Sequence, residues 1–145
     1  MPEDSPKTIN LLIDSKFHNI SAASRAIRGL SEHLALSDID TYYLELCVME
    51  AINNAIQHAY SNEEGHAVNV VISYGPGVVI VKISDTGKKM DLYTPKRPDF
   101  DPDDIKSVPH RGMGLYIIHS VMDEVTYETT GNVNTLTMRK TFYKS

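Results

Sequence analysis

The chain has 145 residues, of which 41% are hydrophobic, and this is enough for one domain with its own apolar core. The formal net charge is −5 and the pI is near 5.6, and no run of Lys or Arg exceeds two residues. This composition argues against a nucleic-acid backbone as the main ligand, so we expect proteins or small molecules as partners.

The single cysteine, Cys47, cannot form an internal disulfide, so we expect a small buried packing residue in a reducing, cytoplasmic setting. The first residues lack the basic and apolar regions of a signal peptide, and no segment approaches the ~20 apolar residues that span a bilayer. We therefore expect a single cytoplasmic domain over residues 1–145, with no membrane segment.

The first half of the chain predicts one strand followed by two helices. Apolar and polar residues alternate first, and apolar residues then recur at helical spacing. Asp14 or Ser15 is the expected cap of the first helix, and a stretch from Ser37 caps the second. The expected elements are a strand over 8–14, a helix over 17–34 and a helix over 39–60.

The second half predicts two hairpins separated by a long loop and a helix. Gly75-Pro76-Gly77 and Gly131-Asn132 are the expected turns. Residues 88–111 are rich in Pro and charge, and a loop of this length in a compact domain is more often a functional lid than a linker. The expected elements are strands over 68–74 and 78–83, a helix from about 115 to 123, and strands over 125–129 and 135–141.

This order of elements predicts a two-layer α/β (α+β) sandwich. Strands joined mainly by hairpins, with helices inserted between them, give a mixed, mainly antiparallel sheet with helices on one face. Leu136 and Met138 are expected to face the core in the last strand.

The segment from Glu50 to Tyr60 is the most informative part of the sequence. At helical spacing its Ala and Ile side chains lie on one side, and the opposite side carries Glu50, Asn54, His58, a second Asn and a Gln. Glu50 and Asn54, one turn apart, can direct a proton acceptor and an amide oxygen at the same volume, and the oxygen suits Mg²⁺. An exposed polar stripe is an equally good interpretation of this segment alone. We expect His58, a lone histidine, to support the site rather than act as a base.

Asp85-Thr86-Gly87 comes where an apolar strand opens into the long loop. A carboxylate there can accept a hydrogen bond from an exocyclic amino group such as that of adenine, and the glycine allows a base to approach the backbone. Taken alone, the tripeptide is more typical of an ordinary turn. Asp91 is either a second polar contact or a solvated loop residue.

Gly112-Met113-Gly114-Leu115 precedes the third expected helix. Backbone N–H groups at a helix start can bind phosphates, and Arg111 can add positive charge. A flexible helix start accounts for the same residues. The segment is not a Walker loop, since no Gly-Lys-Ser/Thr follows, and it lacks the parallel strands of a dinucleotide fold.

Together, in this order, the three segments resemble the N, G1 and G2 boxes of the Bergerat-type (GHKL) ATP-binding fold. The resemblance covers nearly the whole chain and is closest to the small stand-alone members, the anti-sigma-factor serine/threonine kinases of bacterial partner-switching systems. Lys89 stands where many members of the wider fold have a second G1 glycine, which puts in doubt that family's lid geometry rather than nucleotide binding.

The resemblance implies ATP and Mg²⁺ as cofactors and Glu50 as the catalytic base. It further implies that Asn54 holds Mg²⁺, that Asp85 binds the adenine amino group, and that Gly87 leaves space for the base. The remaining implied nucleotide-binding residues are His58, Asp91, Arg111, Gly112, Met113, Gly114 and Leu115.

The resemblance also implies protein partners. The substrate would be a serine or threonine on a STAS-domain anti-sigma-factor antagonist, the other partner a sigma factor, and the chain a homodimer. The alternative function is a non-catalytic, nucleotide-gated switch that binds a protein target other than a sigma factor.

Overall fold

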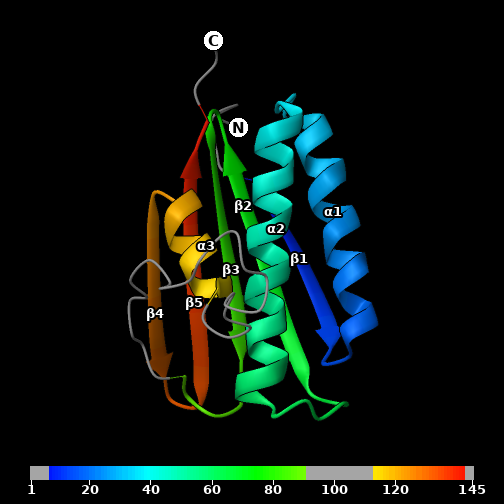
Figure 1. The fold of residues 1–145 in the computed structure, drawn as a ribbon, viewed down its shortest axis with the longest axis vertical. Coiled ribbons are helices and arrows are strands. Elements are labelled where there is room, and N and C mark those ends of the chain that lie inside the picture. The colour runs from blue at the N-terminus through cyan, green and yellow to red at the C-terminus, as the bar shows by residue number, and fades with distance from the viewer. Residues whose placement is uncertain (1–6, 91–112, 143–145) are drawn as a thin grey trace, which may run out of the picture.

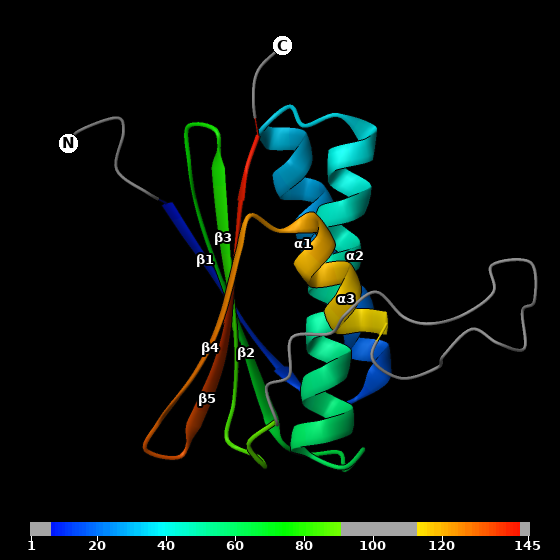
Figure 2. The same ribbon diagram turned by 60° about the vertical axis from the view of Figure 1, so that its left-hand side comes forward.

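The computed structural model describes residues 7–90 and 113–142, which form one sheet with helices packed on one face (Figures 1 and 2). The sheet has five strands in the order β1-β2-β3-β5-β4, and each neighbouring pair is antiparallel. In chain order the elements are β1 (Lys7–Asp14), the short 3₁₀ helix η1 (Phe17–Asn19), α1 (Ile20–His33), α2 (Asp38–Asn54), the π-helical turn η2 (Ala55–Ala59), β2 (Ala67–Gly75), β3 (Val78–Asp85), α3 (Met113–Val121), β4 (Glu124–Thr130) and β5 (Val133–Thr141).

The two-layer sandwich expected from the sequence is confirmed, with a sheet that is antiparallel throughout the described part rather than mixed. The connection between β1 and β2 explains this difference. A single helix would carry the chain back to the end of the sheet where β1 begins and make the strands parallel, whereas the helical pair α1 and α2 brings it back to the end where β1 stops. β2 therefore enters antiparallel to β1 (Figure 1).

The core lies between the three helices and the inner face of the sheet. β2, β3 and β5 each bury every second side chain, which is the alternation that the sequence predicted. Leu136 and Met138 face inward as expected. Along β1, at the sheet edge, Ile9, Leu11 and Ile13 are only partly buried, and Leu12 on the opposite face is 73% exposed. The helices thus cover one side of the sheet only (Figure 2).

Helix α2 begins as the sequence predicts, with the Ser37 hydroxyl oxygen accepting a hydrogen bond from the Asp40 backbone N–H at 3.1 Å. Its end differs from the expected continuous helix to residue 60. The α-helix stops at Asn54, and the next turn is a π-helix in which the N–H of Tyr60 donates to the carbonyl of Ala55. Such turns are frequent at functional sites, and this one directly follows the Glu50–Asn54 pair.

The start of α1 contradicts the expected cap. Neither Asp14 nor Ser15 caps the helix, which is entered through the 3₁₀ turn. The Ser15 hydroxyl is buried and donates to the Glu63 carbonyl at 2.6 Å, while it accepts from the His66 N–H at 3.1 Å. Because Ser15 fastens the loop before β2, its side chain is not available to the helix.

Cys47 is fully buried in α2, which confirms its packing role, and burial raises the pKa of its thiol to about 12. Within residues 7–90 and 113–142, no helix combines the length and the apolar character that crossing a membrane requires.

Ile52→Ala should lower the free energy of unfolding by about 2–5 kcal/mol, because Ile52 is fully buried between α2 and the sheet and its truncation leaves a cavity. Ile39→Ala is the matched control, since Ile39 lies in the same helix and is 66% exposed. We expect the control to stay within about 0.5 kcal/mol of the unchanged protein in urea unfolding. Equal losses in the two variants would contradict the placement of the core.

Candidate functional site

The end of α2 and the end of β3 converge on one small hollow. It gathers three of the predicted site residues, Asn54, His58 and Asp85, among apolar side chains. The residues lining it are Ala51, Asn54, Ala55, His58, Ala59, Ile83, Asp85, Met90, Tyr127 and Leu136. Polar groups at the edge of an apolar slot are typical of a site for a flat, partly polar ligand. The hollow has a volume of about 20 Å³.

Asn54 carries a polar atom that the surrounding protein leaves without a partner. Its amide Nδ2 is buried and donates a hydrogen bond to none of the residues that the structure describes. A buried amide nitrogen in this state costs free energy that a ligand can recover. An amide side chain can present nitrogen or oxygen at the same place by a flip, so Asn54 suits a donor or an acceptor on a ligand.

Glu50 lies against the first turn of α3. Gly114 is the second residue of this helix, and a Cβ built on it would stand 2.5 Å from Glu50 Oε2 and 3.4 Å from Glu50 Cδ. Only a residue without a side chain allows this approach. The contact places a carboxylate next to the positive end of a helix, where phosphates are also favoured.

Gly114 differs from its predicted position before the helix, because α3 starts at Met113 and includes Gly114 in its first turn. Leu115, next in this helix, is half-buried. Asp91, Arg111 and Gly112 lie outside the described residues, as does most of the predicted lid.

Asp85, the last residue of β3, is nearly buried, with 8% of its surface exposed. Its Oδ1 accepts two hydrogen bonds, from the backbone N–H of Gly87 at 3.1 Å and from Asn134 Nδ2 at 2.8 Å. Burial raises the pKa of the carboxyl group, and these two bonds oppose the rise by stabilising the ionised form. A buried carboxylate held by hydrogen bonds is a suitable acceptor for a hydrogen bond from an amino group of a ligand.

Gly87 is required by packing between the strand end and the helix end. A Cβ on Gly87 would collide with the carbonyl of Ala59 and stand 2.8 Å from Tyr60 Cδ1. The Lys88 N–H donates to that same carbonyl at 2.8 Å, and the Thr86 N–H donates to the Tyr60 hydroxyl at 2.8 Å. The prediction that Gly87 leaves space for a base stays untested, but the contact with Ala59 alone demands a glycine.

Sequence reasoning missed two polar residues of this region, Asn134 and Tyr127. Asn134 is 2% exposed and bonds to Asp85, and the Tyr127 hydroxyl accepts a hydrogen bond from the Met90 N–H at 2.9 Å. The signal for Asn134 was present, because it shares the inward phase of Leu136 and Met138. A polar residue at a strand position whose alternate neighbours are apolar indicates a buried side chain that forms hydrogen bonds.

His58 lines the hollow and is exposed, and its predicted supporting role stays a prediction. Among the described residues, no group of three or more His, Cys, Asp or Glu side chains is arranged to hold a metal. Asn54 and Glu50 can still offer oxygens to a cation that takes its other ligands from water and phosphate.

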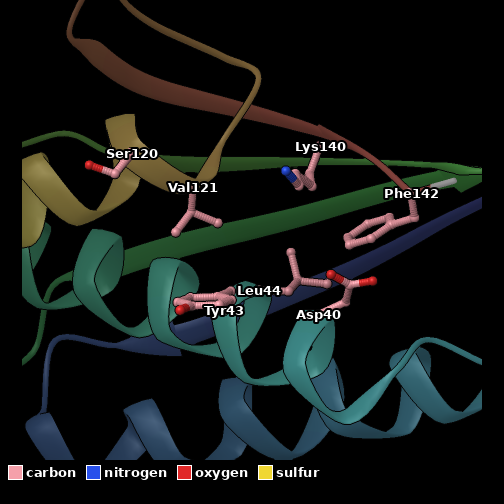
Figure 3. A pocket seen from close by; sticks show the side chains of 7 residues that line it. All are labelled: Asp40, Tyr43, Leu44, Ser120, Val121, Lys140 and Phe142. Atoms are coloured by element: carbon pink, nitrogen blue, oxygen red, sulfur yellow. The ribbon is translucent and has the colours of Figure 1, made fainter.

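A second, larger cavity of about 320 Å³ lies at the N-terminal half of α2 (Figure 3). Its walls come from α2, the end of α3 and the end of β5, and its lining is Asp40, Tyr43, Leu44, Ser120, Val121, Lys140 and Phe142. None of the predicted site residues lines it, so the nucleotide hypothesis concerns the smaller hollow.

Comparison with known proteins identifies the family of the chain. Residues 13–140 match the histidine kinase-like ATPase domain family. The chain belongs to this family. The GHKL resemblance drawn from the three sequence boxes is thereby confirmed, and the family implies ATP binding.

The relatives found are distant but cover most of the chain. The serine-protein kinase RsbW of Oceanobacillus iheyensis is 26% identical over 81% of this chain and 76% of its own length. RsbW of Staphylococcus epidermidis is 29% identical over 85% of this chain and 80% of its own.

Among solved structures, that of the RsbU and RsbW domains of a Mycobacterium tuberculosis protein superposes with a TM-score of 0.68 at 13% identity. The match covers 96% of this chain and 33% of that longer chain. At this identity the likeness supports the fold alone.

Gly87→Ala should lower the free energy of unfolding by about 1–3 kcal/mol, because the new methyl group meets the Ala59 carbonyl and the two backbones must separate. Gly29→Ala is the matched control, since Gly29 lies inside α1 with no atom within 4 Å of the added Cβ. The free energy of unfolding of the control should rise by about 0.5–1 kcal/mol, because alanine has a higher helix propensity than glycine. Thermal unfolding of both variants measures the difference, and a stable Gly87→Ala protein would contradict the close contact.

Proposed function

We propose that this protein is an ATP-dependent serine/threonine protein kinase that acts as an anti-sigma factor. Its substrate would be a serine or threonine on a STAS-domain anti-sigma-factor antagonist. The observation that carries the proposal is the contact between the Glu50 carboxylate and the first turn of α3. It lies one helical turn from the Asn54 amide, whose nitrogen has no partner among the described residues. The kinase names of the distant RsbW relatives support the same activity.

Phosphoryl transfer depends mainly on alignment and charge neutralisation, so few protein groups are required. In our proposal the ionised Asp85 accepts a hydrogen bond from the adenine amino group. The N-terminal turn of α3 then faces the phosphates, and its backbone N–H groups donate to their oxygens. Glu50, next to that turn, accepts the proton from the incoming hydroxyl group.

Mg²⁺ fits the donor groups of this site. A magnesium ion usually takes one or two protein oxygens together with phosphate oxygens and water. Asn54 offers an amide whose nitrogen has no hydrogen-bond partner among the described residues, so a flip that brings its oxygen to this place breaks no bond of that nitrogen to the described residues. When bound, the ion would neutralise charge on the phosphates. Asn54 would hold it through its amide oxygen, and Glu50 would stay free to act as base.

The proposed partners are the STAS-domain antagonist as substrate, a sigma factor as bound target and a second copy of this chain. We place the protein in the cytoplasm, where these partners act. The net charge of −5 agrees with protein partners rather than nucleic acid.

Glu50→Gln should reduce phosphoryl transfer by about 10²–10⁴-fold, because the amide cannot accept the proton of the attacking hydroxyl group. The measurement is transfer of label from γ-labelled ATP, with Mg²⁺, to each STAS-domain protein encoded in the same genome. ATP affinity, measured by calorimetry, should change by no more than about threefold, since the side chain keeps its size.

Glu45→Gln is the matched control, since it makes the same chemical change in the same helix. The Glu45 carboxylate accepts hydrogen bonds from Ser24 and Arg28 of α1, so it faces the neighbouring helix rather than the hollow. The control should keep full phosphoryl transfer at a temperature where thermal unfolding shows it to be folded. A loss equal to that of Glu50→Gln would mean that any lost carboxylate on α2 has this effect.

The same assay separates the proposal from its alternative. Full transfer by Glu50→Gln would show that Glu50 is not the base. An unchanged protein that binds ATP but labels none of the STAS-domain proteins would overturn the kinase assignment and leave the nucleotide-gated binding switch.

Gly114→Ala should lower phosphoryl transfer by at least about tenfold without lowering stability. The added methyl group displaces the end of the flexible Glu50 side chain, while alanine improves helix propensity by up to about 1 kcal/mol. Transfer assays and thermal unfolding are measured on the same preparation. Full activity in a stable Gly114→Ala protein would argue against a catalytic position for Glu50.

A further inference from the structure

Three side chains form a hydrogen-bonded row across β4, β5 and β3. Thr129 and Asn134 are register partners between β4 and β5, and Asn134 and Asp85 are register partners between β5 and β3. The Thr129 hydroxyl donates to Asn134 Oδ1 at 2.8 Å, and Asn134 Nδ2 donates to Asp85 Oδ1 at 2.8 Å. The row ends at the carboxylate that faces the hollow beneath α2.

The row leaves the Asn134 amide one orientation. Its nitrogen also donates to the Gly87 carbonyl at 3.0 Å, so both N–H groups are directed at acceptors. A flipped amide would place its oxygen against the Asp85 carboxylate and the Gly87 carbonyl, while the Thr129 hydroxyl lost its acceptor. Asn134 is 2% exposed, so water cannot replace these bonds without opening the strand end.

The bonds hold one oxygen of Asp85 and leave the other for a ligand. Oδ1 receives both protein donors, Asn134 Nδ2 and the Gly87 N–H. Within the described part of the chain, no donor reaches Oδ2. Because rotation of the carboxylate would break the two bonds to Oδ1, the direction of Oδ2 is fixed before any ligand arrives.

We propose that Asn134 is a positioning residue that fixes Asp85 for a base with a 6-amino group, and thereby selects adenine over 6-oxo purines. The inference rests on the proposed nucleotide site. A fixed Oδ2 accepts from a 6-amino group but repels the oxygen that a 6-oxo purine carries there. A carboxylate that can turn accepts instead from the N1–H of the 6-oxo purine, so selectivity depends on the row.

The experiment measures the affinity of the full chain for Mg·ATP and Mg·ITP by calorimetry, since inosine carries the 6-oxo group. The unchanged protein should bind ATP at least about a hundredfold more tightly than ITP. Asn134→Ala should weaken ATP binding by about tenfold and bring the ATP-to-ITP ratio below about ten. Thr129→Val, which keeps the shape and removes the hydroxyl group, should shift the ratio in the same direction by a smaller factor.

Thr135→Val is the matched control. The Ser84 and Thr135 hydroxyl groups form a 2.9 Å hydrogen bond between β3 and β5. They are the register pair next to Asp85 and Asn134 and lie on the other face of the sheet. The control therefore loses one cross-strand bond and should keep the ATP-to-ITP ratio of the unchanged protein. Thermal unfolding accompanies each variant, and Thr129→Val tests the proposal if Asn134→Ala does not fold.

The outcomes separate this inference from the proposed function. An unchanged protein with no ATP affinity would overturn both. An unchanged protein that prefers ATP, together with folded Asn134→Ala and Thr129→Val proteins that keep the full preference, would overturn the role of Asn134 alone. If the ATP-to-ITP ratio fell equally in Thr135→Val, the change would come from lost strand stability, and the positioning role of Asn134 would also be overturned.

Discussion

The site depends on one close contact, between the end of β3 and the end of the helical segment α2–η2. The backbone of Gly87 lies against the Ala59 carbonyl, which also accepts the Lys88 N–H, and the Tyr60 hydroxyl accepts the Thr86 N–H and donates to the Ala67 carbonyl at 2.6 Å. These bonds satisfy backbone groups where a helix and a strand both end, and such groups are costly to leave unpaired. The contact fixes the distance between Asp85 on the sheet and Asn54 on the helix.

A second glycine contact has the same physical character on the other side of α2. Gly114 brings the first turn of α3 against Glu50, as Gly87 brings the strand end against the helix end. In each case the missing side chain allows backbone to approach a group of α2 or of the turn that follows it, so these glycines serve contact with the protein itself. The three sequence boxes thus correspond to one helical segment and the two glycines that contact it from different sides.

Most of the fold was predictable because burial imposes simple periods on the sequence. Ile9, Leu11 and Ile13 gave the first strand by alternation, and Ser37 gave the start of α2 by its capping chemistry. The same reasoning was wrong in proposing Ser15 as a possible helix cap, because its hydroxyl group donates a hydrogen bond to the loop before β2, 48 residues later. No local pattern reports a partner so far along the chain.

The residues of the candidate site likewise divide into those predictable from a local pattern and those that depend on distant partners. Glu50 and Asn54 were found because both lie on one helix face, whose geometry the sequence fixes within one turn. Asn134 was missed because its importance comes from pairing with Asp85, 49 residues away, and from the register that Thr129 shares with it. The π-helical turn η2 was likewise missed, since its backbone bonds form at the end of a helix held by the sheet.

The walls of the hollow differ in how readily they can move, which bears on the proposed binding of a nucleotide. Its polar wall is fixed, because Asp85 is held by two hydrogen bonds and Asn54 belongs to α2. Its volume is only about 20 Å³, so in the proposed nucleotide complex further space would come from the apolar wall. Met90 is the side chain suited to provide it, because methionine is unbranched and repacks readily, while its backbone N–H stays bonded to Tyr127. Recognition would then reside in the rigid polar groups and adaptation in one flexible side chain at the start of the long loop.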